Sequence, residues 1–113
     1  MSIESMNEEL MTASMQIILN AGDARNTLAD ALKDAKKFDF IAADEKLREA
    51  KNLATRAHKS QTEIIQNEAS GKQYPHSLLF THAQDHLMTI NSEVNFTSEL
   101  IDILKLINQK SNK

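Results

Sequence analysis

The chain has 113 residues, about the size of one small domain, so we expect a single domain over residues 1–113. Its 13 Lys and Arg against 16 Asp and Glu give a formal net charge of −3, which argues against a nucleic-acid-binding protein. Two Gly and one Pro provide too few turns for an all-β fold, and the absence of Cys excludes disulfides and thiolate metal sites.

We expect a cytoplasmic protein. The start of the chain, Met1–Glu9, is polar and acidic and does not resemble a signal peptide. No apolar run approaches the roughly 18 residues that a membrane span needs. The lack of Cys also fits a reducing compartment.

Three long segments, about 7–36, 40–70 and 76–110, are predicted to be amphipathic helices. Each has small or apolar residues at alternating spacings of three and four, which place them on one helix face. The expected core positions are 10, 14, 17, 21, 24, 28, 31 and 35 in the first segment, 40, 43, 47, 50, 54, 57, 61 and 64 in the second, and 79, 83, 87, 90, 94, 97, 101 and 104 in the third. The ends of the chain, Met1–Asn7 and Ser111–Lys113, are expected to be frayed.

Two short connections separate these segments. Asp39 follows two lysines and suits the N-cap of the second helix, and Gly71 is typical of the position after a helix C-terminus. Pro75 or Ser77 then begins the third helix. Short connections make successive helices antiparallel. The expected fold class is therefore all-α, with an antiparallel three-helix bundle as the protomer.

The third segment has more apolar surface than one seam of such a bundle needs. A second stripe lies about 60° around the helix from the core positions, formed by Phe96, Leu100, Ile103 and Ile107. Beside its core positions the first segment also carries three apolar residues, namely Met11, Met15 and Ile18. A monomer would expose this surface as a large patch, so the sequence favours self-association through the third helix over an unusually apolar monomer.

Toward the start of the third segment, the second stripe changes to polar residues. These are His82, Asp85, His86 and Thr89. Burying an unpaired charge costs several kcal/mol, so these side chains either face water or have a functional partner. In the second segment Gln61 interrupts the core positions, and His58 lies nearly one turn before it.

The residues alone leave three interpretations of His82–His86 open. The first is an exposed polar helix start, where the helix dipole favours the negative charge of Asp85. The second is a metal site, since two His at i and i+4 around a carboxylate resemble the H-x-x-E-H ligands of some zinc peptidases, although one straight helix cannot surround a tetrahedral ion. The third is a nucleophilic imidazole that accepts a phosphoryl group and passes it on.

At these residues the sequence resembles a known family. Thr81–Thr89, which reads Thr-His-Ala-Gln-Asp-His-Leu-Met-Thr, is similar to the active-site signature of the enzyme IIA component of the lactose/cellobiose (N,N′-diacetylchitobiose) class of the phosphoenolpyruvate-dependent sugar phosphotransferase system. Three further segments match this family, namely Ala21–Arg25, Ala57–Thr62 and Glu68–Gly71. The resemblance extends from about Glu8 to Lys110. Ala83 is the variant typical of cellobiose and chitobiose members, whereas lactose members tend to carry Gly there.

The resemblance implies a homotrimer of three-helix protomers, a nine-helix bundle with the third helices near its axis. It implies that His82 carries a phosphoryl group from the phosphocarrier protein HPr to the cysteine of the cognate enzyme IIB, as a phosphotransferase component in disaccharide uptake. It further implies that no nucleic acid takes part and that the membrane is involved only indirectly, through enzyme IIC. Asp85 would meet its symmetry mates around a structural Mg²⁺ or similar divalent cation, which relieves their repulsion; protons shared among the carboxylates are the alternative.

Physical roles follow for the residues around His82. A neutral His82 has one ring nitrogen free to attack phosphorus while an acceptor holds the other. The amides of Gln84 and Gln61 are expected to donate hydrogen bonds to phosphoryl oxygens, and a protonated His86 can do the same. For Gln61 and His58 the alternative is a purely structural role inside the bundle.

A second class of function also remains open. The chain could be a non-catalytic helical oligomerisation or interaction module, in which the third helix only drives assembly. A gain of one acid-labile phosphate on incubation with phosphoenolpyruvate, enzyme I and HPr distinguishes the two classes. The sequence specifies neither the disaccharide, whose selection belongs to enzyme IIC, nor the identity of the metal.

Overall fold

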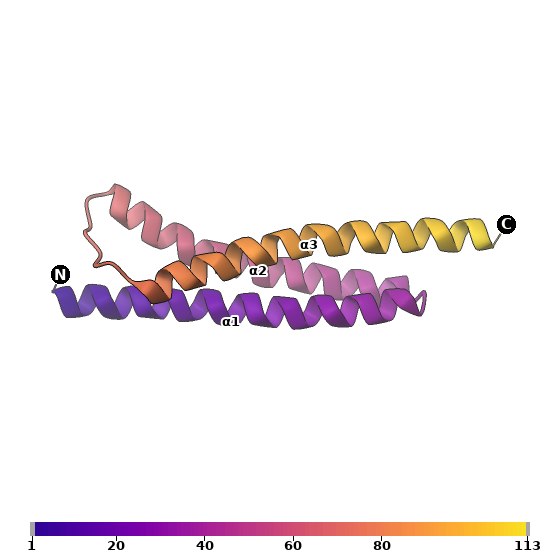
Figure 1. The fold of residues 1–113 in the computed structure, drawn as a ribbon, viewed down its shortest axis with the longest axis horizontal. Coiled ribbons are helices and arrows are strands. Elements are labelled where there is room, and N and C mark those ends of the chain that lie inside the picture. The colour runs from indigo at the N-terminus through magenta and orange to yellow at the C-terminus, as the bar shows by residue number, and fades with distance from the viewer. Residues whose placement is uncertain (1, 113) are drawn as a thin grey trace.

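The computed structural model describes residues 2–112 and contains three helices, α1 (Ile3–Lys36), α2 (Phe40–Ala69) and α3 (Leu78–Ser111). They run up, down and up in a rod that is 66 Å long and 20 by 19 Å across (Figure 1). No strand occurs within residues 2–112. The prediction of an all-α protomer built as an antiparallel three-helix bundle is confirmed.

The helices extend further toward the ends of the chain than the pattern predicts. The expected fraying of Met1–Asn7 is wrong from the third residue onward, because Ser2 caps α1 and its hydroxyl accepts a main-chain hydrogen bond at 3.1 Å. At the other end α3 continues through Ser111. For Met1 and Lys113 the expectation lies outside the described residues.

Backbone hydrogen bonds close the turn between α1 and α2 around Phe38. The Phe38 amide donates to the Ala35 carbonyl at 2.9 Å, and the Asp39 amide donates to the Asp34 carbonyl at 3.0 Å. This pair of bonds forms the Schellman motif, in which Phe38 takes a φ of 62° that is uncommon for a residue with a side chain. Asp39 then caps α2, as predicted, by accepting a bond from an amide of the first turn at 3.2 Å.

The connection between α2 and α3 begins in the same way. Gly71 follows the end of α2 with a φ of 106°, a conformation that favours glycine, and the Gly71 and Lys72 amides each donate to a carbonyl of the last turn at 3.0 Å. Ser77, and not Pro75, caps α3, because its hydroxyl accepts a main-chain hydrogen bond at 3.1 Å. The third helix therefore begins at Leu78, two residues later than the pattern predicts.

The core is formed by small and aliphatic side chains at the expected positions. Every buried residue of the three helices is one of those positions. The four expected core residues that are only half-buried are Phe40, Gln61, Leu79 and Leu104. Alanine is the commonest buried residue, which lets the helices approach closely. The buried hydroxyl of Ser14 donates to the Leu10 carbonyl at 2.7 Å, so this polar group is satisfied.

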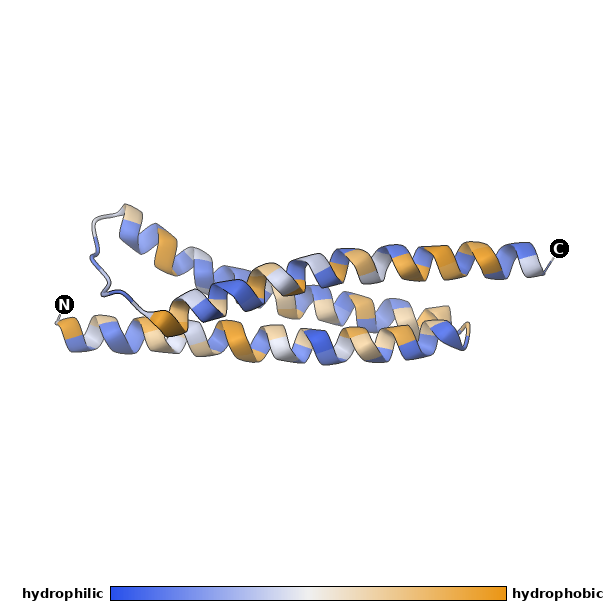
Figure 2. Cartoon of the chain, viewed as in Figure 1, coloured by the Kyte–Doolittle hydropathy of each residue, from blue (hydrophilic) through white to orange (hydrophobic). Residues whose placement is uncertain are grey.

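The second apolar stripe of α3 is exposed in the single chain. Its four residues are about half or more exposed, namely Phe96, Leu100, Ile103 and Ile107. Figure 2 shows apolar residues continuing along the C-terminal half of α3, which extends past the turn between α1 and α2. In α1, Ile18 packs against the core, whereas Met11 and Met15 are exposed. Within residues 2–112, no helix combines the length and the apolar character that a membrane crossing requires.

Candidate functional site

The first turns of α3 bring His82 and His86 into direct contact. Their Nε2 atoms are 3.0 Å apart, their ring centroids are 4.5 Å apart, and the ring planes are nearly perpendicular, at 88°. Residues four apart lie on the same face of a helix, so the contact follows from their spacing. His82 is exposed and His86 is half-buried, so another molecule can reach the His82 ring.

Asp85 lies on the face of α3 that points away from the core. It is 18 residues before Ile103, which is about five full turns, so the two residues project in the same direction. Its carboxylate forms no ion pair with any residue from 2 to 112. Over the same residues, a single chain contains no group of three or more His, Asp or Glu that could hold a metal ion. A cation at Asp85 would therefore need carboxylates from further copies of the chain.

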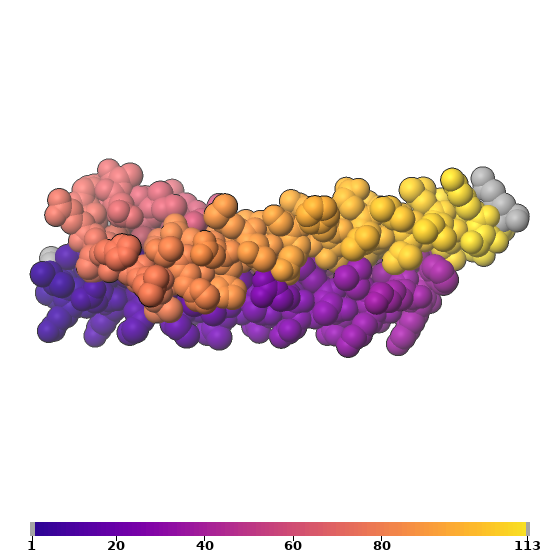
Figure 3. All heavy atoms as spheres, viewed as in Figure 1, coloured from indigo at the N-terminus to yellow at the C-terminus, as the bar shows by residue number. Residues whose placement is uncertain are grey.

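Gln84 lies on a different side of α3 from His82. Two residues along a helix are about 200° apart around its axis, so the two side chains diverge. Gln84 instead lines a pocket of about 230 Å³, together with Leu10 of α1 and with Tyr74 and Ser77 of the loop. Figure 3 shows the first turns of α3 lying against the N-terminal half of α1. Within one chain, the expected hydrogen bond from Gln84 to a phosphoryl group on His82 is not supported.

Gln61 and His58 are not brought to His82 within one chain either. Gln61 is half-buried on the inner side of α2, and no hydrogen bond joins it to His82. His58 is exposed and lines a groove of about 410 Å³ between α2 and α3, with Asn91 and Asn95 on the opposite wall. Asn91 is nine residues beyond His82, roughly 13 Å along the helix.

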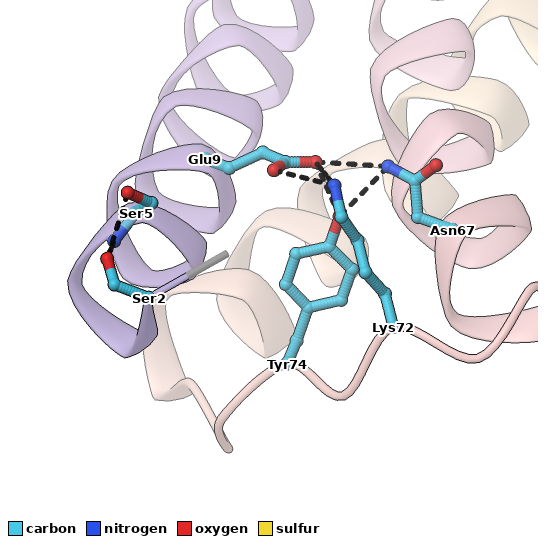
Figure 4. Close-up of polar contacts among 6 residues, drawn as sticks. All are labelled: Ser2, Ser5, Glu9, Asn67, Lys72 and Tyr74. Carbon is cyan, nitrogen blue, oxygen red and sulfur yellow. Dashed lines mark hydrogen bonds and ion pairs between the residues drawn. The ribbon is translucent and has the colours of Figure 1, made fainter.

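The loop before α3 is held against α1 by a hydrogen-bonded cluster around Glu9 (Figure 4). No motif or spacing in the sequence indicates this cluster. The Glu9 carboxylate accepts a bond from the Tyr74 hydroxyl at 2.5 Å and bonds from the Lys72 ammonium at 3.0 and 3.1 Å. Asn67, near the end of α2, donates to Glu9 at 3.0 Å and to the Tyr74 oxygen at 2.9 Å. The cluster thus joins α1, α2 and the loop that ends at Ser77, the cap of the helix that carries the histidines.

The contacts of this cluster shift the pKa values of its members. The hydrogen bond from Tyr74 and the bond and charge of Lys72 lower the pKa of the Glu9 carboxyl. Burial raises the pKa of the Tyr74 hydroxyl, and the neighbouring Glu9 raises it further. The hydrogen bond to Glu9 raises the pKa of the Lys72 ammonium. All three shifts favour the observed arrangement of an ionised carboxylate, a neutral phenol and a charged ammonium.

A second polar contact between helices joins Arg25 of α1 to Glu93 of α3. The Arg25 Nε is 2.9 and 3.2 Å from the two carboxylate oxygens of Glu93, and this hydrogen bond raises the pKa of Arg25. Glu93 is eleven residues beyond His82, roughly 16 Å along the helix, so within one chain the contact ties α1 to α3 at a distance from His82.

Comparison with known proteins places the chain in a family. Residues 12–105 match the family model described as "PTS system, Lactose/Cellobiose specific IIA subunit", where PTS denotes the phosphotransferase system. The chain is 43% identical over 101 residues to the PTS system lactose-specific EIIA component of Lactococcus lactis subsp. lactis, and the match covers 88% of this chain and 96% of that protein.

Solved structures of two relatives share the fold. The PTS cellobiose-specific enzyme IIA from Bacillus anthracis superimposes with a TM-score of 0.84 at 40% identity, over 89% of this chain and 93% of that one. The IIA(chitobiose)–HPr complex of the N,N′-diacetylchitobiose branch of the Escherichia coli phosphotransferase system gives a TM-score of 0.76 at 36% identity, over 88% and 96% of the two chains. These relatives are named for different sugars, so the similarity identifies the component and not one disaccharide. The chain belongs to the lactose/cellobiose-specific IIA family of the phosphotransferase system and is an enzyme IIA component.

Proposed function

We propose that this enzyme IIA component carries a phosphoryl group on His82, received from phosphorylated HPr and passed to the cysteine of the cognate enzyme IIB. The observation that carries the proposal is the exposed His82 ring, held on a rigid helix in contact with a second imidazole. The relative from the chitobiose branch was solved in complex with HPr, which supports HPr as the donor here.

The contact with His86 suits this transfer. When the His86 Nε2–H donates to His82 Nε2, the hydrogen bond holds the His82 ring as the tautomer whose Nε2 carries a lone pair, and this bond opens as that lone pair turns to phosphorus. As a new bond from nitrogen to phosphorus forms at His82, the bond from phosphorus to HPr breaks, and the electron pair of that bond leaves with HPr. The His86 N–H is then beside the phosphoryl oxygens and can stabilise their charge. In the second transfer the cysteine sulfur of enzyme IIB attacks phosphorus, and His82 regains its lone pair.

The remaining supporting residues would act only across a boundary between copies. Gln84 faces away from His82 in its own chain, and His58 lies further along the bundle. We propose that in a trimer these side chains and Gln61 approach the His82 of a neighbouring copy. Their amides and imidazole can donate to phosphoryl oxygens without adding a full charge.

We also propose that the chain assembles as a homotrimer around the exposed face of α3, which gives a nine-helix bundle. Phe96 and Ile103 would be buried against their symmetry mates, and Asp85 would bring three carboxylates to the axis. Carboxylate oxygens are the ligands that hard cations prefer, so the Asp85 side chains fit a structural Mg²⁺ or similar ion. Such an ion would supply positive charge against the repulsion of the three carboxylates.

In the cell, this component is proposed to work in the cytoplasm and to reach the membrane only through enzyme IIC. Its transport system would take up a disaccharide of the cellobiose, chitobiose or lactose type, in keeping with the names of the relatives. The IIA chain itself contacts protein partners, and selection of the sugar belongs to the membrane component.

The test of the carrier function is intact-mass measurement after incubation with phosphoenolpyruvate, enzyme I and HPr. Wild-type protein should gain one phosphate that is labile in acid, and His82→Ala should gain none while keeping its helicity and oligomer mass. His76→Ala, which changes an exposed histidine of the loop, is the matched control and should still be labelled. Labelling of His82→Ala together with loss of labelling in His86→Ala would move the acceptor to His86. No labelling of the wild type would favour the alternative, a non-catalytic interaction module.

A further inference from the structure

We propose that the Nε2 atoms of His82 and His86 form a two-nitrogen site for a borderline transition-metal ion such as Zn²⁺, Ni²⁺ or Cu²⁺. The site is distinct from the oxygen site proposed at Asp85. In a second step, which rests on the proposed carrier function, a bound ion blocks transfer of the phosphoryl group to His82. Carrier activity would then depend on the free concentration of such ions.

The geometry of the two rings favours chelation of one ion. Two nitrogens bound at about 2.05 Å with an angle of 90° at the metal lie about 2.9 Å apart, and a tetrahedral angle separates them by about 3.3 Å. The observed separation of the His82 and His86 nitrogens, 3.0 Å, falls between these values. The ring centroids would be about 4.5 Å apart at the 90° angle, which equals the observed 4.5 Å.

The ring orientation distinguishes this arrangement from a simple collinear hydrogen bond. If both rings were aligned along one linear N–H···N bond of this length, their centroids would lie about 5.3 Å apart. The shorter distance between the His82 and His86 centroids shows that the ring axes are not collinear, which allows them to point toward a common position. The two lone pairs can therefore converge on a point beside the helix, where a metal ion would replace the shared proton.

The ligand set selects the kind of ion. Neutral imidazole nitrogens suit Zn²⁺, Ni²⁺ and Cu²⁺, and affinity is expected to rise toward Cu²⁺, whereas Mg²⁺ prefers oxygen. Asp85 does not complete the site in a single chain, since no group of three potential ligands occurs within residues 2–112. Water would fill the remaining coordination positions, which His82 permits because it is exposed. Such a site has moderate affinity and exchanges its ion.

The ion and the phosphoryl group need the same electron pair. A lone pair on His82 Nε2 that is donated to a metal cannot attack phosphorus, and a phosphorylated nitrogen cannot bind a metal. Binding to His86 alone would leave only one ligand, so phosphorylation of His82 should weaken metal binding as strongly as removing a histidine does.

The first experiment measures Zn²⁺ binding by isothermal titration calorimetry with tag-free protein. We expect one ion per chain, and His86→Gln should weaken binding by at least the ~10-fold that loss of even an outer-shell partner of a metal site costs. His76→Gln is the matched control and should bind like the wild type. Asp85→Leu should also retain Zn²⁺, because it removes only the oxygen site. Unchanged binding in His86→Gln, or loss of binding in Asp85→Leu, would overturn the assignment to the histidine pair.

The second experiment follows a single transfer from purified phosphorylated HPr, without enzyme I, at increasing Zn²⁺. Transfer to wild-type protein should slow in proportion to occupancy of the site and should recover when EDTA is added. An unchanged rate at saturating Zn²⁺ would overturn the competition. A wild-type protein that accepts no phosphoryl group even without Zn²⁺ would instead contradict the carrier function, while the calorimetric result on the metal site would stand.

Discussion

Glu9 is the residue at which α1, α2 and the loop before α3 converge. Its carboxylate accepts bonds from Tyr74, Lys72 and Asn67, and these bonds hold its pKa below the ordinary value of 4.5. A carboxyl whose pKa is lower in the folded than in the unfolded state stabilises the fold above the unfolded pKa. That stabilisation is lost as the pH falls through the folded pKa, because the unfolded chain then binds the extra proton.

The first prediction follows from this loss of stability at low pH. Glu9→Gln should lower the stability of the protein at pH 7. The difference from wild type should shrink below pH 4.5, where the carboxyl of the unfolded chain becomes protonated before that of the folded chain. The measurement is the midpoint of urea unfolding at pH 7 and pH 3, at one protein concentration. Glu8→Gln is the matched control, because Glu8 is an exposed neighbour outside the cluster, and it should change neither midpoint. Equal midpoints for the two variants at pH 7 would show that the cluster contributes no stability.

Features that depend on neighbouring residues could be predicted from the sequence, whereas contacts between residues far apart in the chain could not. The caps at Asp39 and Gly71 depend on neighbouring residues, so their sequence context was enough. The bond between Tyr74 and Glu9 joins residues 65 apart, and no periodicity links them. The role of Gln84 stays a prediction: it projects from the opposite side of the helix to His82, so it would need the His82 of a neighbouring copy.

Among the three elements, α3 differs because it has two apolar faces. One packs into the bundle through Leu87, Ile90 and Ile101, and the other exposes Phe96 and Ile103. The 3–4 spacing predicted both faces, since helix geometry alone decides which side chains share a face. It could not predict what covers the second face, because a single chain offers no further helix to pack against it.

The second prediction concerns that exposed face. Ile103→Asp should dissociate the proposed trimer, because it would place a charge in an apolar interface at a cost of several kcal/mol. Sedimentation at micromolar concentration should give about three times 12.7 kDa for the wild type and a mass near 12.7 kDa for the variant. Ile41→Asp makes the same change at an exposed position on α2 and should remain trimeric. A wild-type protein that sediments as a monomer would exclude assembly through α3.

In the whole molecule, the proposed phosphoryl site and the proposed assembly surface lie on one side of one helix. His82, Asp85 and Ile103 lie within about 60° of one another around the axis of α3, from its first turns to its last third. The face that would close the trimer therefore continues directly into the site that would carry the phosphoryl group. Assembly and transfer would be coupled in the proposed trimer, because neighbouring copies would complete the surroundings of His82.

Asp85 provides the sharpest test of this arrangement, since its position predicts opposite results for a monomer and a trimer. In a monomer Asp85 is an exposed residue in the third turn of α3, beyond the reach of the helix dipole, and replacing it should change the stability by no more than about 0.5 kcal/mol. In the proposed trimer three carboxylates meet at the axis, and Asp85→Leu replaces their repulsion by apolar contact, which is often neutral or stabilising. The wild type, which would hold a cation there, should lose stability when the ion is removed, because an ion that binds only the folded trimer stabilises it by mass action.

The measurement is a thermal melt with added Mg²⁺ and then with excess EDTA. We expect the melting temperature of the wild type to fall on chelation, and that of Asp85→Leu to equal or exceed the wild-type value and to be indifferent to EDTA. Asp102→Leu makes the same change on α3, about 100° around the helix from Asp85, so its trimer should keep the response to chelator. A wild-type melt that ignores EDTA, together with a destabilised Asp85→Leu, would remove Asp85 from the axis. The trimer would then be held by the apolar residues of α3 alone.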